Sequence, residues 1–203
     1  DLDELEELFY WCTYGGNSLV VNVAPDQTGR IRENEANAII SLNRERLHIK
    51  KGKPLPTGGE LVSLGAKTEA SSVYEGKTSE FGANKAVDGG MQTRWAASEN
   101  SADLTVYLDG EKEFNKIVIF EYCDVVNSDD GFSNKRYNRI RSYCIDVWLD
   151  GCWETVYISD EPMGDCKVVR FPKKYKSDKV RLRVLDASAP PSIYEFCVFD
   201  VAD

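Results

Sequence analysis

The sequence predicts a mainly β protein, with an all-β sandwich over residues 60–203 behind a short helix-strand-helix segment. From residue 60 onward, short apolar stretches are divided by turn residues, and residues 179–185 alternate charged and apolar side chains as a half-buried strand does. Asp150-Gly151 suits a two-residue hairpin turn. We expect eight strands, at about 61–72, 103–108, 114–122, 139–149, 153–158, 166–171, 179–185 and 193–201.

The first part of the chain has a different pattern. Residues 2–12 carry apolar side chains at helical spacing behind an acidic start, and Gly15-Gly16 is expected to end this helix. Residues 17–24 are apolar and β-branched, which predicts a strand buried on both faces, and residues 32–48 predict a second helix. One strand between two helices cannot close a core. Since the sequence also begins without methionine, we expect a longer parent protein.

The segment from Gly15 to Gly29 reads Gly-Gly-Asn-Ser-Leu-Val-Val-Asn-Val-Ala-Pro-Asp-Gln-Thr-Gly. It resembles the late-barrel signature of glycoside hydrolase family 29, the α-L-fucosidases. The resemblance implies that residues 1–48 are the last helix, strand and helix of a (β/α)8 catalytic barrel. The nucleophile and the acid/base carboxylate of that family lie earlier in the barrel, so no residue here inherits a catalytic role. We interpret Asp26 as a turn residue and expect this chain alone to be inactive.

A linker rich in Pro, Gly and Lys occupies residues 49–59 and separates residues 1–48 from the sandwich at 60–203. His48, the single histidine, is interpreted as a solvated residue at the end of the second helix. The sequence has no Gly-x-Ser-x-Gly elbow to build a nucleophilic triad with it.

Composition excludes several functions. The formal net charge is −9 without a basic block, which argues against nucleic acid and anionic membranes as partners. No apolar run reaches the roughly 18 to 20 residues of a membrane span. Six cysteines without a CxxC pair, and one histidine, do not suit tetrahedral zinc. We expect mostly free thiols, with a disulfide between neighbouring strands as the alternative.

The stretch from Lys85 to Trp95 is rich in oxygen and built to turn sharply. Within it, Asp88 supplies a carboxylate, Gly89-Gly90 allow a tight bend, and Thr93 supplies a hydroxyl. A hard cation such as calcium prefers these oxygen ligands. The alternative is a Gly-rich surface turn followed by a core tryptophan.

A second resemblance covers residues 64–201. Its motifs, in order, are Ala83 to Gly89, Thr93-Arg94-Trp95, Ile117 to Glu121, Asn138-Arg139-Ile140, Gly151 to Glu154, Val180 to Val184 and Pro191 to Phe196. They resemble a discoidin domain, also called a coagulation-factor type C domain, whose bacterial members form carbohydrate-binding module family 32. The resemblance implies an eight-stranded, galactose-binding-like jelly roll with one structural calcium. The implied calcium ligands are the carbonyls of Lys85, Gly90, Thr93 and Tyr194, the Thr93 hydroxyl, and the side chains of Asp88 and Glu195.

Sugar recognition needs a flat aromatic face together with planar hydrogen-bonding groups. Loops on the calcium-bearing edge offer Tyr74, Arg94, Trp95, Glu121, Phe132 and Arg139 as candidate sugar contacts. Trp95 could instead be a core residue, and Glu121 could form a structural ion pair with Arg139. Trp148 and Trp153 are interpreted as packing residues. The sandwich has no histidine of the kind that often holds galactose in this family, so another glycan stays open.

We therefore expect a calcium-stabilised, non-catalytic carbohydrate-binding module at the C-terminus of a secreted, periplasmic or cell-surface glycoside hydrolase of the α-L-fucosidase type. Its partners would be a glycan, containing galactose or fucose, and the catalytic barrel of the parent chain. The alternative is a structural or protein-interaction sandwich that binds no sugar. A membrane-binding role, as in clotting-factor relatives, does not suit the acidic surface.

Overall fold

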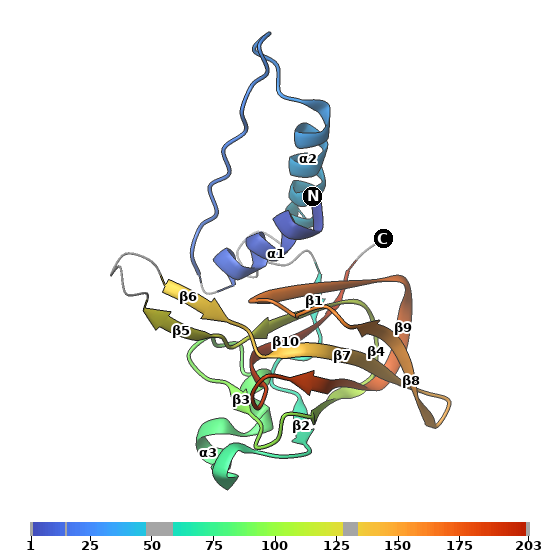
Figure 1. The fold of residues 1–203 in the computed structure, drawn as a ribbon. Coiled ribbons are helices and arrows are strands. Elements are labelled where there is room, and N and C mark those ends of the chain that lie inside the picture. Colours follow the sequence, from blue (N-terminus) through green and yellow to red (C-terminus); the bar gives the residue numbers. More distant parts are fainter. Residues whose placement is uncertain (1, 15, 48–58, 128–133, 202–203) are drawn as a thin grey trace. The chain divides into compact units, whose positions relative to one another are not determined.

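A computed structural model of the protein describes residues 2–14, 16–47, 59–127 and 134–201 (Figure 1). Contacts divide the chain into two compact units, one made of Asp1–Glu60 with Val201–Asp203 and the other of Leu61–Asp200. The expected linker at 49–59 and His48 lie outside the described residues except for Gly59.

The first unit contains the two expected helices, α1 (Leu2–Thr13) and α2 (Glu33–Leu47). Acidic residues in the first turn of each helix suit the positive end of the helix dipole. After α1, Gly16 adopts a left-handed φ of 88° and its N–H donates to the Thr13 carbonyl at 2.9 Å. This glycine therefore ends the helix as the sequence predicts.

The expected strand at residues 17–24 is wrong for this structure. These residues lie in no strand, and Val20 is 85% exposed rather than buried. A strand needs neighbours for its N–H and C=O groups, and no described strand pairs with this segment. The turn after it is as expected: the Asp26 carboxylate accepts from the Thr28 hydroxyl and from the N–H groups of Thr28 and Arg30. These bonds, led by the Thr28 hydroxyl, lower the pKa of Asp26.

The second unit is the β-sandwich. Its main strands are β1 (Glu60–Leu61), β2 (Lys67–Ala70), β3 (Trp95–Ala96), β4 (Ala102–Glu121), β7 (Ile140–Leu149), β8 (Cys152–Ser159), β9 (Cys166–Ala187) and β10 (Ser192–Asp200). Their order is β1-β10-β4-β9-β7-β8, with β2 on β4 and β3 on β10. The strands from β10 to β8 in this order pair antiparallel, as do β2 with β4 and β3 with β10.

Two long strands connect the layers of the sandwich. The first half of β4, residues 102–107, pairs with residues 179–184 of β9, and its second half pairs with residues 166–177. A register shift after Tyr107, next to Gly110 with its φ of 74°, accompanies the bend (Figure 1). The strands expected at 103–108 and 114–122 are thus one continuous strand, β4, and those expected at 166–171 and 179–185 are likewise one strand, β9.

The core lies between the two halves of these bent strands. Leu104 and Val106 from the first half of β4 join Ile117 and Ile119 from its second half in one buried cluster. Burial alternates strictly from Ala102 to Leu108, as expected for strands with one face on a core. Each large apolar side chain buried here contributes on the order of 2 kcal/mol.

Short elements complete the sandwich. The expected strand at 61–72 is interrupted by a turn at Gly65, so that only β1 and β2 form. Between β2 and β3 lie three short helices, η1 (Tyr74–Gly76), α3 (Thr78–Phe81) and η2 (Ala83–Ala86). A further hairpin pairs β5 (Asp124–Asn127) with β6 (Asn134–Tyr137).

Two expectations from composition can be compared with the fold. All six cysteines are free thiols, as expected, and four of them, Cys123, Cys144, Cys166 and Cys197, are buried. Among the described residues, no helix is both long enough and apolar enough to cross a membrane.

Candidate functional site

The loop between η2 and β3 is held against the last strand. β3 pairs with β10 through Trp95 and Ile193, which brings residues 88–93 beside the start of β10. Gly89 has a φ of 83°, a left-handed conformation that favours glycine. The register of β10 on β4 shifts between Ile193 and Glu195. Such irregularities re-aim side chains near functional sites.

Two carboxylates converge on one main-chain N–H in this loop. The Gly90 N–H lies 3.1 Å from Asp88 Oδ1 and 3.0 Å from Glu195 Oε1. Glu195 Oε1 also accepts the Gly89 N–H at 2.8 Å, and the Thr93 hydroxyl donates to Asp88 Oδ2 at 2.7 Å. Glu195 is buried and Asp88 is exposed. The structure thus brings together four of the six residues expected to hold calcium, with Gly90 contributing its N–H to the network rather than the expected carbonyl.

These residues fit a cation chemically. Like charges this close repel each other unless a cation or a proton lies between them. A Cβ on Gly90 would lie only 3.2 Å from Asp88 Oδ1, so a glycine keeps this cradle open. The described residues contain no group of three or more His, Cys, Asp or Glu that could share a metal. A cation here would need main-chain oxygens as well, and the other two expected ligands, Lys85 and Tyr194, flank the network along the chain.

A cavity of about 360 Å³ opens beside this loop. Its lining residues are Tyr74, Phe81, Arg94, Ala96, Ala97, Arg139, Ala189 and Pro190. Tyr74 is 42% exposed and its ring meets the Phe81 ring edge-on, with centroids 5.6 Å apart. The residue after Tyr74, Glu75, has a φ of 48°, a strained conformation for a residue other than glycine. Strain of this kind gathers at functional sites.

Arg94 brings a cation to the cavity. Its guanidinium carbon lies 4.2 Å from the Tyr122 ring centroid and 5.0 Å from that of Phe81. Among the described residues it makes no hydrogen bond or ion pair, and its Nε is buried without a partner. Aromatic contacts hold a guanidinium in place but satisfy none of its N–H donors. Arg94 therefore has donors available to a ligand.

Arg139, the second cation of the lining, is already engaged. Its Nε and Nη2 donate to the two carboxylate oxygens of Asp124 at 2.9 and 2.8 Å, and its Nη1 donates to the Pro190 carbonyl at 2.8 Å. Hydrogen bonds from Arg139 lower the pKa of Asp124. The guanidinium carbon also lies 5.2 Å from the Tyr122 ring centroid. Arg139 thus ties three segments together at one wall of the cavity.

Glu121 does not line the cavity. It is fully buried, and its Oε1 accepts the main-chain N–H groups of Arg139 at 2.6 Å and Ile140 at 2.8 Å. Burial raises its pKa to about 7, against the lowering effect of these two bonds. The expected sugar contact is therefore replaced by a structural role. The hydrogen-bond partners of Glu121 are the main-chain N–H groups of Arg139 and Ile140 where β7 begins, not the Arg139 guanidinium.

Trp95 also departs from the expected sugar contact. Its side chain is 0% exposed, and its indole N–H donates to the Ser72 carbonyl at 3.1 Å. The Ser192 hydroxyl donates to the Trp95 carbonyl at 2.8 Å. Trp95 is thus a core residue that fastens the loop to its neighbours, which was the alternative interpretation. Phe132 lies outside the described residues.

Sequence reasoning missed several residues of this site. Phe81 and Tyr122 supply the rings that hold Arg94, and Asp124 and Pro190 fix Arg139. A signal existed for Asp124, an acidic residue at the start of the long loop before Arg139. The β5–β6 hairpin pairs Asp124 with Tyr137 and so brings it back toward Arg139.

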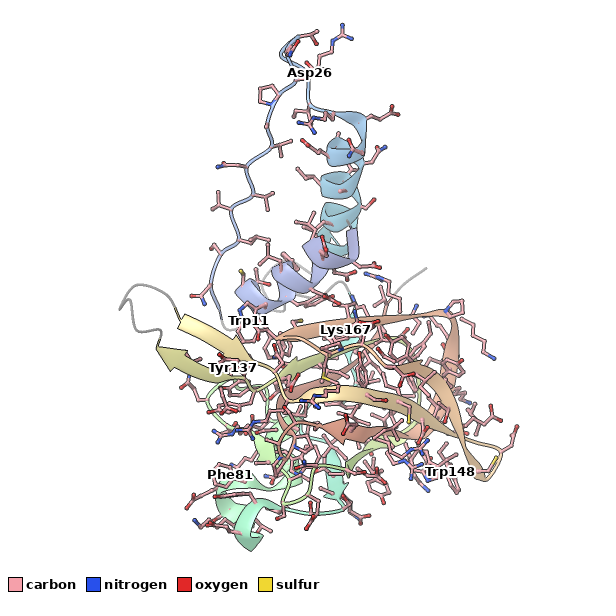
Figure 2. All side chains as sticks on the ribbon, viewed as in Figure 1. Trp11, Asp26, Phe81, Tyr137, Trp148 and Lys167 are labelled. Atoms are coloured by element: carbon pink, nitrogen blue, oxygen red, sulfur yellow. The ribbon has the colours of Figure 1, made fainter. Side chains whose placement is uncertain are left out.

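Trp148 and Trp153 belong to a different part of the sandwich. Their rings meet edge-on at 5.2 Å across the β7–β8 pair, and cations of Lys179 and Arg181 lie over them at 4.3 and 4.4 Å. Trp148 lies well away from Phe81, which marks the cavity (Figure 2). With cations over their rings, the two tryptophans have the packing role expected of them.

The sandwich can now be compared with known proteins. Residues 67–196 match the family model of the F5/8 type C domain. The chain belongs to this family. Its similarity extends beyond the domain: Alpha-L-fucosidase 1 from Arabidopsis thaliana is 24% identical over 187 residues, which cover 91% of this chain and 33% of the relative. The chain thus spans about a third of the length of that relative.

Solved structures share the fold. A putative α-L-fucosidase from Bacteroides thetaiotaomicron covers the whole chain with a TM-score of 0.64 and 22% identity, over 40% of its own length. Chitosan-binding module 1 from a Paenibacillus sp. IK-5 chitosanase/glucanase covers 70% of the chain and 98% of the module, with a TM-score of 0.57 and 24% identity. A family 32 carbohydrate-binding module from C. perfringens, in complex with galactose, has a TM-score of 0.56 and 18% identity, and the match covers 70% of this chain and 98% of the module.

Proposed function

We propose that the F5/8 type C domain of this chain is a non-catalytic carbohydrate-binding module, and that its binding site is the cavity between Tyr74 and Arg139. The observation that carries the proposal is the composition of the cavity wall. Two aromatic rings, Tyr74 and Phe81, stand beside an arginine, Arg94, whose donors no described residue uses.

The chemistry of the wall suits a sugar. A pyranose ring presents a flat apolar face of C–H groups, which packs on an aromatic side chain, and a rim of hydroxyls, which need planar donors and acceptors. Tyr74 at the exposed rim offers such a face, and Arg94 offers five N–H donors in a fixed fork. Small alanines at 96, 97 and 189 leave the ring room to enter.

The ligands of related modules support the class of ligand. One neighbour of the same fold is a chitosan-binding module and another is in complex with galactose. We propose a glycan for this chain on the same grounds, with galactose- and fucose-containing sugars as first candidates. The absence of a histidine from residues 60–203 is a reason to test beyond galactose.

We further propose that calcium binds between Asp88 and Glu195. The Asp88 and Glu195 side chains, the Thr93 hydroxyl and the carbonyls of Lys85, Gly90, Thr93 and Tyr194 would hold it, which satisfies the preference of calcium for six to eight oxygens. Bound there, the ion supplies positive charge that neutralises two carboxylates. Arg94 follows Thr93 directly, so an ordered loop also fixes one wall of the sugar cavity.

The role of the module would be to hold a glycoside hydrolase near glycans. Support comes from the Arabidopsis α-L-fucosidase, whose similarity covers both units of this chain. A linked catalytic domain benefits even from millimolar binding, since tethering raises the local concentration of substrate. We expect no turnover of a nitrophenyl fucoside by these 203 residues alone, and turnover would contradict this assignment.

Titration by NMR tests the sugar site. Galactose, N-acetylgalactosamine, fucose and their oligosaccharides are added to the ¹⁵N-labelled chain, and amide shifts are expected around Tyr74, Phe81 and Arg94. The second candidate function, a structural sandwich, is favoured by the engagement of Arg139, Glu121 and Trp95 in internal hydrogen bonds. Silence across all neutral and charged sugars would establish the structural role and reject sugar binding.

A further inference from the structure

We infer that the cavity takes an acidic sugar, one whose ring carries a carboxylate or a sulfate ester. The inference rests on the proposed glycan site and narrows its ligand. Among the described residues, the lining of the cavity includes two guanidinium groups, Arg94 and Arg139, and no carboxylate. All other lining side chains are aromatic, alanine or proline.

The two cations differ in how far they are neutralised. Arg139 forms a two-bond ion pair with Asp124, so that this pair contributes little net charge. Arg94 has no ion pair with any described residue, since its contacts are the rings of Phe81 and Tyr122. The wall of the cavity therefore carries one positive charge that no carboxylate within bonding distance compensates.

Arg94 is also held as a binding group should be. Its guanidinium is planar and lies against two rings, which removes much of the freedom that a ligand would otherwise have to freeze. Its buried Nε lacks an acceptor in the described residues, and an unsatisfied buried donor is costly. A carboxylate accepts two parallel N–H bonds from one guanidinium, which would satisfy both the charge and the donor.

Other classes of sugar fit less well. The hydroxyls of a neutral sugar can accept hydrogen bonds but bring no charge to Arg94, whose nearest compensation among the described residues is the longer-range attraction of Asp124, a carboxylate already bonded to Arg139. An amino sugar such as glucosamine brings a second positive charge and is repelled. The formal charge of −9 on the whole chain repels anions at a distance, but salt screens that effect beyond about 10 Å. The local charge thus decides the preference.

Matched monosaccharides test this inference on the 203-residue chain, with calcium present. Galactose, galacturonate, galactose 6-sulfate and galactosamine differ only in the group attached to the ring. We expect galacturonate or the 6-sulfate to bind at least roughly tenfold more tightly than galactose by NMR titration, and galactosamine to bind more weakly than galactose. Comparing the carboxylate with the sulfate shows which acid is preferred. Raising NaCl from 50 to 500 mM should weaken only the acidic ligands.

Variants assign the preference to Arg94. Arg94→Met should weaken galactose as well, because Arg94 also donates to sugar hydroxyls, but it should weaken galacturonate far more, so that the ratio of the two affinities falls by roughly ten- to a hundredfold and the acidic preference is lost. Lys173→Met is the matched control, because Lys173 also lies over a ring, that of Tyr175 at 5.0 Å, outside the cavity lining. It should keep the preference. Arg94→Lys keeps the positive charge but not the planar set of donors, and it should retain part of the acidic preference. It replaces Arg94→Met as the test variant if circular dichroism shows that Arg94→Met is unfolded.

The outcomes separate the two proposals. Equal affinity for galactose and galacturonate would overturn the acidic preference and leave glycan binding intact. An undiminished preference in Arg94→Met, or in Arg94→Lys if the former unfolds, would overturn the role of Arg94. A chain that binds none of the four sugars would reject both the preference and the glycan site.

Discussion

The carboxylate of Glu195 accepts the main-chain N–H of Gly89 at 2.8 Å, across 106 residues of sequence. This bond joins the last strand of the sandwich to a loop near its beginning. Because Glu195 is buried, its charge must be compensated where it stands. Two N–H groups donate to Oε1 and the Cys197 thiol lies 3.9 Å from Oε2, and the proposed calcium would add positive charge to these contacts.

Removal of calcium should therefore destabilise the domain. An ion present at about a hundred times its dissociation constant adds roughly 2.7 kcal/mol of stability. For a domain of this size, that corresponds to a fall of about 5 to 10 °C in melting temperature when a chelator is added. Differential scanning calorimetry with and without chelator measures it.

Glu195→Gln is the matched variant for this prediction. The glutamine oxygen can still accept the N–H groups of Gly89 and Gly90, but one of the two carboxylates is gone. We expect the melting temperature of this variant to be nearly independent of chelator. A wild-type chain that is equally indifferent would contradict the calcium site.

A second prediction concerns the glycine that follows α3. Gly82 has φ −64°, which any residue adopts, yet a Cβ there would lie 2.4 Å from the Thr78 carbonyl oxygen. That oxygen also accepts the Gly82 N–H, so it cannot move away without losing this bond. We expect Gly82→Ala to cost about 2 to 3 kcal/mol and, because Phe81 precedes it, to weaken sugar binding.

Gly110→Ala is the control for Gly82. Gly110 has a φ of 74° but nothing within 4 Å of an added Cβ. Its alanine variant should cost only about 1 kcal/mol, from backbone strain, and should leave sugar binding unchanged. Urea denaturation ranks the two, and a larger loss for Gly110→Ala would contradict the clash at Gly82.

Sequence patterns predicted the sandwich better than its connections. Alternation located the buried faces of β4 and β9, as at residues 179–185, because alternation follows directly from strand geometry. It did not predict that β4 continues through Gly110 or β9 through Pro172, since both residues usually interrupt strands. The segment 17–24 has a strand-like composition, but composition does not supply a neighbouring strand.

Some residues of the candidate site could likewise be predicted from the sequence and others could not. Asp88 and Glu195 were predicted from motifs, and in the structure both carboxylates accept a hydrogen bond from the Gly90 N–H. The role of Trp95 could not be predicted, because a ring that binds sugar and a ring that fills a core look alike in a sequence. The Arg94 guanidinium packs on the rings of Phe81 and Tyr122, which leave its N–H donors unused. These contacts join distant segments of the chain and could not be predicted from the sequence.

The third prediction tests the core role of Trp95. Trp95→Phe removes the indole that donates to the Ser72 carbonyl and leaves a cavity in a fully buried position. We expect a loss of about 2 to 4 kcal/mol in the free energy of unfolding. Sugar affinity, measured well below the melting temperature, should change by less than about twofold. A large loss of sugar affinity without a loss of stability would contradict the core role and indicate that Trp95 contacts the sugar.

The last prediction concerns pH. Burial raises the pKa of Glu121 from 4.5 to about 7 in the folded chain, so between these values the folded state holds a proton that the unfolded state has lost. Stability from protonated Glu121 is then fully present below about pH 4.5 and is lost as the pH rises through 7. The loss is at most about 3 kcal/mol.

Glu121→Gln isolates this effect, because glutamine resembles the protonated acid and its oxygen can accept from Arg139 and Ile140 as Glu121 does. Between pH 5 and 8 the carboxyl of Asp124, whose pKa is lowered, stays ionised and adds no slope. We expect the melting temperature of the wild-type chain to fall across this range relative to that of the variant, with the variant more stable at pH 8. Parallel curves for the two proteins would show that Glu121 keeps its charge in the fold. Its buried carboxylate would then be stabilised by the two N–H groups at the start of β7 and by the nearby charge of Arg139.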